Sequence, residues 1–196
     1  MAVLNPFALG LIGAGLLAAG AVFARASQHV ATPSYMVEHR DGNIEVRAYP
    51  ELVLAQVTRS GARRSAVQSA FPALARYIFA KNRPGDKIAM TAPVVQVPVE
   101  NNWVVSFIMP NGSKLEDLPA PQGDVRLLTQ PARRMAAIRF SGRWTDKKFA
   151  DITQQLQVWM DAAGLRDSGP PEYAYYNDPM TPASLRRNEI LIELAR

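Results

Sequence analysis

Few side chains in this sequence are of the kinds that perform acid–base, nucleophilic or metal chemistry. The 196 residues include two histidines and no cysteine, which excludes thiolate metal sites, cysteine nucleophiles and disulfides. His29 falls in a short polar stretch and His39 beside a turn, so we expect neither to be a ligand. No G-x-S-x-G nucleophile motif, phosphate-binding loop or paired-histidine metal motif occurs. The sequence therefore predicts no catalytic residue and no metal site.

With catalytic and metal-binding motifs excluded, the remaining candidates for a functional role are lysine and arginine side chains that lie near apolar ones. Arg76 and Lys81 fall on the polar flank of an expected helix, Lys87 follows this helix, and Arg186–Arg187 precede the last expected strand. Most such charges are solvated surface groups. Arginine, however, offers two parallel N–H donors to a carboxylate. One or two of these cations could therefore pair with the carboxylates of a flat apolar ligand.

The stretch Lys87-Ile-Ala-Met-Thr-Ala-Pro-Val94 lies between the expected helix and a pair of expected strands. Pro93 favours an extended conformation for Ala92, so the stretch should enter a strand and not prolong the helix. Its Met90, together with Met180 near the end of the chain, could line a cleft as an adaptable apolar contact.

Composition indicates one globular domain with a basic surface. The chain is 48% hydrophobic and 20% charged, with a net charge of +5. A basic surface attracts nucleic acid, anionic lipid or a small anionic ligand. No motif favours nucleic acid, so we expect a small-molecule partner.

The N-terminal segment is apolar. Residues 7–24 form an uncharged run of 18 residues, long enough to cross a bilayer as a helix or to serve as the core of a secretory signal. We expect residues 1–26 to be a helical signal peptide or membrane anchor and residues 27–34 a linker. The domain at 35–196 would then be exported to the periplasm or tethered to the membrane.

Hydrophobic periodicity and turn residues predict the elements of this domain. Strands are expected at 35–39, 43–49, 52–59, 94–99, 103–109, 124–130, 133–140, 172–177 and 188–194. Helices are expected at 64–81 and 145–163, each following two strands and preceding two more.

The expected elements form a repeat with an offset of 81 positions. The positions that match at this offset are Pro50 with Pro131, Ser60 with Ser141, Gly61 with Gly142, and Pro98 with Pro179. Each half reads β-β-α-β-β and exposes one apolar sheet face and one apolar helix stripe, so the two halves must pack together. We therefore expect an α+β fold with pseudo-two-fold symmetry. Its mostly antiparallel sheet would be curled or closed into a barrel flanked by two helices, with a ligand cleft between the halves.

Four motifs together resemble the SOUL/haem-binding protein family over residues 35–194. They are Ile44-Glu-Val-Arg-Ala-Tyr49, Lys87-Ile-Ala-Met-Thr-Ala-Pro-Val94, the stretch from Tyr173 to Pro179, and Arg187-Asn188-Glu189. The resemblance implies a distorted β-barrel flanked by two helices. It also implies binding of haem or other tetrapyrroles in an apolar groove beside the first helix, and no settled enzymatic reaction.

The match to this family is incomplete at the positions proposed to hold haem. Some members carry a histidine, a proposed axial iron ligand, where this chain has Ala48. Of two basic positions on the first helix of the family, one corresponds to Gln68 and the other to Arg76. The resemblance thus implies haem or another porphyrin held without a protein axial ligand, with Arg76 pairing a propionate. The expected contacts are Val67, Gln68, Phe71, Arg76, Met90 and Met180.

Three functions are compatible with these residues. The first is non-catalytic carriage or buffering of a tetrapyrrole, which a cleft rimmed by arginine and lysine would favour. The second is a generic binder of flat hydrophobic cations or drugs, because the repeat also resembles the effector domains of multidrug-sensing regulators; buried carboxylates in the cleft would favour it. The third is a hydrolase, which needs a glutamate facing a tyrosine inside the cleft. The residues to inspect for this pair are Glu172, Tyr173, Tyr175 and Glu189.

Overall fold

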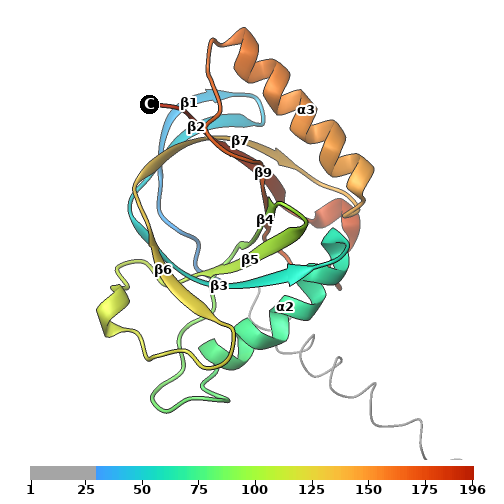
Figure 1. Ribbon diagram of the computed structural model, residues 1–196. Helices are drawn as coiled ribbons and strands as arrows, with labels where there is room; N and C mark the ends of the chain where they lie inside the picture. Colours follow the sequence, from blue (N-terminus) through green and yellow to red (C-terminus); the bar gives the residue numbers. More distant parts are fainter. Residues whose placement is uncertain (1–29) are drawn as a thin grey trace, which may run out of the picture.

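The computed structural model describes residues 30–196, which form an α+β fold of one antiparallel sheet and two α-helices (Figure 1). The strands are β1 (Met36–Asp41), β2 (Ile44–Tyr49), β3 (Leu52–Ser60), β4 (Val94–Val99), β5 (Asn102–Ile108), β6 (Arg126–Gln130), β7 (Arg133–Phe140), β8 (Glu172–Tyr175) and β9 (Asn188–Glu193). The helices are α2 (Arg63–Ile78) and α3 (Asp146–Ala162), with short 3-10 turns η1 (Leu115–Asp117) and η2 (Ala183–Leu185). The expected N-terminal helix lies outside the described residues, as does the linker up to residue 29.

Strand order follows the internal repeat. The elements β2-β3-α2-β4-β5 recur as β6-β7-α3-β8-β9, with β1 as an addition at the start. In the sheet the order is β1-β2-β7-β9-β8-β4-β5-β3-β6. The first strand of each half therefore pairs with the second strand of the other half, β2 with β7 and β6 with β3. This exchange makes the order symmetric about the β8–β4 pair and joins the halves into one sheet.

The expected closure into a barrel is wrong. The sheet curls strongly, but β1 and β6 are its two edges, and no strand pairing joins them within the described residues (Figure 1). Every residue of β1 is exposed. Since β1 buries no apolar side chain, no hydrophobic contact draws it towards β6.

The 81-residue offset also fails in the last quarter of the chain. Pro98 lies within β4, whereas Pro179 lies in the loop between β8 and η2. β4 and β5 are joined by a tight turn at Glu100-Asn101, whereas the connection from β8 to β9 includes η2. The prolines at 98 and 179 are therefore not equivalent.

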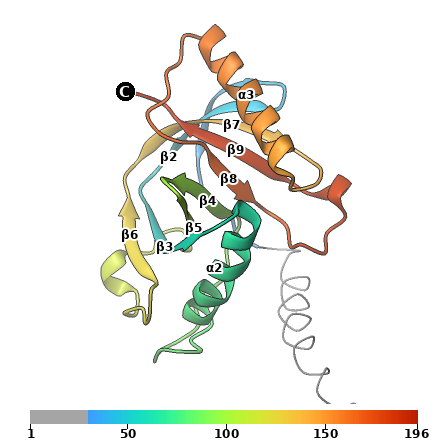
Figure 2. The ribbon, with the colours of Figure 1, turned by 45° about the vertical axis from the view of Figure 1, so that its right-hand side comes forward.

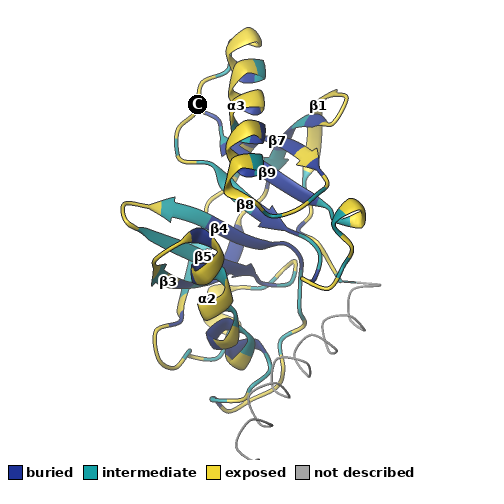
Figure 3. Cartoon of the chain, turned by 90° about the vertical axis from the view of Figure 1, so that its right-hand side faces the viewer, coloured by how far each residue is buried: buried dark blue, intermediate teal, exposed yellow. Residues whose placement is uncertain are grey.

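The curled sheet has two apolar faces. On the convex face α2 packs against β3 and β5, and α3 packs against β7 and β9 (Figure 2). In Figure 3 the strands beneath the helices are largely buried. The core on this face includes Val57, Leu74, Ile78, Ile138, Phe149, Leu156 and Ile190. The concave face carries a second cluster, made of Tyr49, Leu52, Leu54, Val95, Ile108, Met135, Ala137, Ala174 and Leu191. Strand alternation sends neighbouring side chains to these opposite faces.

The two helices are tied together at their N-terminal ends by Arg63. Its buried guanidinium donates to Asp146 Oδ1 (2.6 Å), to the hydroxyl of Tyr175 (2.7 Å) and to the Trp144 carbonyl (2.9 Å). The Tyr175 hydroxyl donates in turn to Gln96 Oε1 (2.9 Å), and Gln96 Nε2 donates to the Arg63 carbonyl (2.7 Å). These buried polar groups are all paired, so they fix the start of α2 relative to α3.

Candidate functional site

An apolar strip borders the buried face of α2. Val67 and Phe71, one helical turn apart, are half-buried and pack against the convex core. The Phe71 ring lies edge-on to Phe107, with 5.3 Å between ring centroids. Gln68 is exposed on the same flank, and so is Arg64 at the start of the helix. This flank therefore combines partly exposed apolar surface with one guanidinium.

Arg76 lies on a different side of α2. A spacing of five residues corresponds to a rotation of about 140° around a helix of 3.6 residues per turn, so Arg76 points away from the side that carries Phe71. Arg76 is exposed and helps to lower the pKa of the Asp124 carboxyl. The main cause of that lowering is the hydrogen bond from Arg59 to Asp124. Arg76 thus faces the region just before β6, away from the apolar strip.

The two predicted methionines occupy different environments. Met90 is half-buried against the same convex core as Phe71, in the segment that leads from α2 into β4. The Ile88 amide in this segment donates to the Ile78 carbonyl at the end of α2 (2.7 Å). Met180 is 74% exposed on the loop after β8, where its amide donates to Asp178 Oδ1 (2.7 Å). Val67, Gln68 and Phe71 thus share one flank of α2, and Met90 packs against the same convex core after the end of the helix. Arg76 lies on another side of the helix, and Met180 lies on an exposed loop.

Ala48, at the position of the family's proposed iron ligand, is remote from α2. It lies in β2, between β1 and β7, whereas α2 packs against β3 and β5. The one histidine of the described chain, His39, stacks on Trp159 of α3, with 6.1 Å between ring centroids. Neither position places an imidazole beside the apolar strip. Within residues 30–196 no group of three or more acidic or histidine side chains could hold a metal ion.

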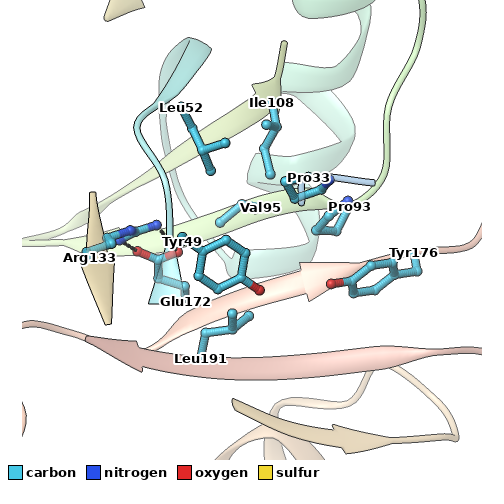
Figure 4. Close-up of a pocket in the computed structure, with 10 residues that line it drawn as sticks. All are labelled: Pro33, Tyr49, Leu52, Pro93, Val95, Ile108, Arg133, Glu172, Tyr176 and Leu191. Atoms are coloured by element: carbon cyan, nitrogen blue, oxygen red, sulfur yellow. Dashed lines mark hydrogen bonds and ion pairs between the residues drawn. The ribbon is translucent and has the colours of Figure 1, made fainter. Parts of the chain in front are cut away.

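The concave face holds a cavity of about 330 Å³. Its apolar lining comes from β3, β4 and β5 and consists of Leu52, Leu54, Val95, Val97, Val99, Val104 and Ile108. Gln56, Ser106 and Gln130 add uncharged polar groups, and Arg133, Glu172 and Glu193 add charges. A second, smaller pocket of about 30 Å³ shares Arg133 and Glu172 with this cavity and is also lined by Tyr49, Tyr176, Pro33 and Pro93 (Figure 4). None of the six residues expected to contact haem lines either space.

Arg133 is the cation of this cavity. Its Nη1 donates to Glu172 and its Nη2 donates to the other oxygen of the same carboxylate (3.0 Å), as the dashed lines in Figure 4 show. Glu193 lies farther from the guanidinium, at 3.4 Å. Burial alone would lower the pKa of Arg133, but the two carboxylates raise it above its ordinary value. Arg133 therefore stays protonated at neutral pH.

A glutamate does face a tyrosine on the concave face, but the tyrosine is neither Tyr173 nor Tyr175. The Tyr176 hydroxyl donates to Glu189 (2.8 Å), while Tyr175 binds Arg63 on the convex face. Burial alone would raise the pKa of Glu189, yet hydrogen bonds and charge from Arg47 and Arg187 lower it. Burial raises the pKa of Tyr176 well above its ordinary value. A carboxylate with a lowered pKa and a phenol with a raised one make a poor base and nucleophile.

Comparison with known proteins identifies the family. The family model described as "SOUL heme-binding protein" matches residues 30–193, which is most of the chain. The chain belongs to the SOUL haem-binding family. No curated protein sequence matches it. Among residues 30–196 neither helix is long and apolar enough to cross a membrane.

Solved structures share the fold of this SOUL protein at low sequence identity. The C-terminal domain of EcmrR is 14% identical with a TM-score of 0.60, and the match covers 83% of this chain and 98% of that domain. A hydrolase from Listeria innocua is 14% identical with a TM-score of 0.54, over 81% of this chain and 94% of that one. An uncharacterised conserved protein from Listeria innocua is 14% identical with a TM-score of 0.55, over 78% and 92%. At such identities the likeness shows the fold alone.

A ligand cleft between the halves was predicted from the sequence, and strands of both halves line the concave cavity, but the expected ligand contacts were placed elsewhere, beside α2. A signal for the cavity lining was nevertheless present. Arg133 stands 81 positions after Leu52, so the repeat places both at the start of equivalent strands. Both line the cavity. Strand alternation from Leu52 then gives Leu54 and Gln56, which also line it. Combining the repeat with the alternation would have located two strands of this wall, β3 and β7.

Proposed function

We propose that this protein binds haem or a related tetrapyrrole, without catalysis, on the strip formed by Val67, Gln68, Phe71 and Met90. The observation that carries the proposal is the partly exposed apolar flank of α2 beside an exposed guanidinium, in a chain of the SOUL family. Carrier and buffer are the roles that such a surface site serves, because ligand can enter and leave without a conformational change.

The residues present suit a porphyrin in two respects. Val67, Phe71 and Met90 offer apolar surface to the macrocycle, and Arg64 on the same flank offers paired donors to a propionate. Arg76, the cation expected from the family pattern, lies about 140° around the helix from Phe71, so we assign the propionate contact to Arg64. Gln68 would lie at the edge of the macrocycle. Met180 would contribute only if its exposed loop reached the strip.

The expected affinity follows from apolar burial. Covering about 300 Å² of apolar surface contributes roughly 7 kcal/mol at about 25 cal/mol per Å². Loss of translational and rotational freedom offsets part of this gain, and the contact with Arg64 adds a little. A dissociation constant of 1 μM corresponds to about 8 kcal/mol. We therefore propose binding that is no tighter than micromolar, without a protein axial ligand.

We further propose three parts for the chain and a location outside the cytoplasm. Residues 1–26 would be the signal peptide or membrane anchor, 27–34 the linker and 35–196 the binding domain. The proposal rests on the uncharged run at residues 7–24. Fractionation of cells that produce the full chain, followed by N-terminal sequencing, tests it. Intact protein in the cytoplasm would contradict it.

Hemin titration of the full-length chain tests the binding proposal. We expect a saturable shift of the Soret band at micromolar protein. Arg64→Ala should weaken binding about two- to five-fold, the usual worth of an exposed ion pair. Arg76→Ala is the matched control, because it removes the same side chain from another side of the same helix, and it should change little. No saturable shift would overturn the proposal, and a loss confined to Arg76→Ala would move the site to the side of α2 that faces Asp124.

A further inference from the structure

The concave cavity has the size and lining of a small-molecule site, and it lies on the opposite face of the sheet from α2. Its volume of about 330 Å³ is at the low end of the ~300–1,000 Å³ typical of ligand pockets. That size suits a molecule of a few rings better than a tetrapyrrole macrocycle. Aliphatic side chains such as Leu54, Val97 and Val104 supply the apolar contact.

The charges of the lining leave one carboxylate in excess. Arg133 neutralises Glu172 through two hydrogen bonds, and both side chains are largely buried, at 14% and 13% exposed. Glu193 is 38% exposed and only 3.4 Å from the same guanidinium. The other lining residues are uncharged. An anionic ligand would therefore meet net repulsion in this cavity, whereas a cation would gain from the carboxylate of Glu193.

Other charges on the concave face lie outside the lining. Arg126 is exposed on the edge strand β6, two residues before Leu128, and lies opposite Gln56 of β3. The buried carboxylate of Glu189 is compensated by Arg47 and Arg187. Neither group changes the sign of the charge at the Glu193 end of the cavity.

One donor of Arg133 lacks a partner. Its Nε is one of two buried side-chain polar atoms in the described residues that make no hydrogen bond. Such atoms are rare in folded proteins, and a ligand or an ordered water usually supplies the missing acceptor. An ether oxygen, ring nitrogen or carbonyl could accept this N–H without adding a third negative charge beside Glu172 and Glu193.

We propose that the concave cavity binds an apolar organic cation of a few rings, with its positive group beside Glu193 and its rings against the valine and leucine side chains. This site is distinct from the tetrapyrrole strip on α2, because the sheet separates the two. Each site can therefore exist without the other.

Thioflavin T, a flat permanent cation whose fluorescence rises when it is immobilised, is a suitable probe. The full-length chain would be titrated in a fixed concentration of non-ionic detergent, with detergent alone as the blank. We expect saturable binding of thioflavin T that is at least three-fold tighter than binding of the anionic dye 8-anilinonaphthalene-1-sulfonate. No saturable thioflavin T binding, or tighter binding of the anionic dye, would overturn the proposal.

Variants locate the probe. Glu193→Gln should weaken thioflavin T binding about three- to ten-fold, and Glu116→Gln, which removes an exposed carboxylate on η1, should not. Val104→Trp should abolish binding of the cation by filling the cavity, with an unchanged melting temperature showing that the variant is folded. Arg64→Ala should leave thioflavin T binding unchanged, and Glu193→Gln should leave hemin binding unchanged. Equal loss of thioflavin T binding in Glu193→Gln and Glu116→Gln would refute the assignment to this cavity.

Discussion

Replacement of Glu189 should severely destabilise the fold. The side chain is fully buried, at 0% exposed. Its oxygens accept hydrogen bonds from Arg47 (2.7 and 3.1 Å), from Arg187 (2.8 and 3.0 Å) and from the Tyr176 hydroxyl (2.8 Å). Because the lowered pKa keeps Glu189 ionised at neutral pH, it compensates two guanidinium groups at once.

The magnitude follows from what Glu189→Leu leaves behind. Arg47 is 3% exposed, so it would remain as a buried charge that keeps its ion pair with Glu45 (2.7 Å) but loses its main partner, whereas Arg187 is 28% exposed and can turn to water. Removing one partner of a buried ion pair lowers the free energy of unfolding by roughly 3–5 kcal/mol. In a domain of this size that corresponds to a fall in melting temperature of about 6–20 °C. Single domains are stable by only about 5–15 kcal/mol, so the loss should be unmistakable.

Urea denaturation followed by tryptophan fluorescence measures this cost. The double variant Arg47→Leu/Glu189→Leu should lose less stability than the sum of the two single variants, because it removes both charges together. Glu38→Gln is the control, since Glu38 pairs with Arg134 at the surface and should contribute less than about 1 kcal/mol. A loss below about 1 kcal/mol for Glu189→Leu, or strict additivity in the double variant, would refute this reasoning.

The other predictions concern pH and one buried hydroxyl. Because the pKa of Glu189 in the folded state lies below its ordinary value of 4.5, its contribution to the free energy of unfolding is complete above that pH and is lost as the pH falls further. Urea midpoints between pH 6 and pH 3 should therefore fall more steeply for the unaltered protein than for Glu189→Gln, and parallel curves would contradict this. Burial raises the pKa of Tyr49 and Tyr175 to about 12. Absorbance at 295 nm should thus show phenols that titrate well above pH 10 in the folded protein and near pH 10 in urea; a single folded-state step at pH 10 would be inconsistent with their burial. Tyr175→Phe removes the hydroxyl between Arg63 and Gln96 and should cost about 1–3 kcal/mol in urea unfolding, whereas an unchanged midpoint would show that this contact is not needed.

Local patterns predicted the secondary structure of the described chain well. The expected strands at 94–99 and 133–140 match β4 and β7 residue for residue, and the expected helix at 145–163 differs from α3 by one residue at each end. Thr145 caps that helix by accepting a hydrogen bond from the Lys148 amide (3.2 Å). Alternation and capping depend on neighbours in the chain, so the sequence contains the information needed to find them.

Closure of the sheet could not be predicted in the same way. Whether β1 meets β6 depends on the curl of the whole sheet, and no short stretch of sequence encodes that curl. Pro98 and Pro179 match in sequence but not in structure, because the connection from α2 to β4 is longer than the connection from α3 to β8.

The candidate site was only partly predictable, and for a different reason. Val67 and Phe71 were predicted from the apolar stripe of the helix and Met90 from the motif at residues 87–94, and all three pack against the convex core. Helical geometry alone predicts that Arg76 and Phe71 lie on different sides of the helix. The family resemblance compares residue types and takes no account of the angular position of Arg76. The cavity around Arg133 needed strand pairings between distant parts of the chain, which become clear only when the repeat and the strand alternation are considered together.

Within residues 30–196 no strand pairs with the outer edge of β1 or β6, which has a consequence for the range of ligands that the concave face can admit. The strand number and shear of a closed barrel fix its circumference, so its lumen cannot widen without rupture of main-chain hydrogen bonds. A sheet with two free edges has no such constraint, because small changes of twist spread over several strands can alter its curvature while every ladder stays intact. We therefore expect the concave cavity to adjust its width, so that ligands of different size could contact the same side chains.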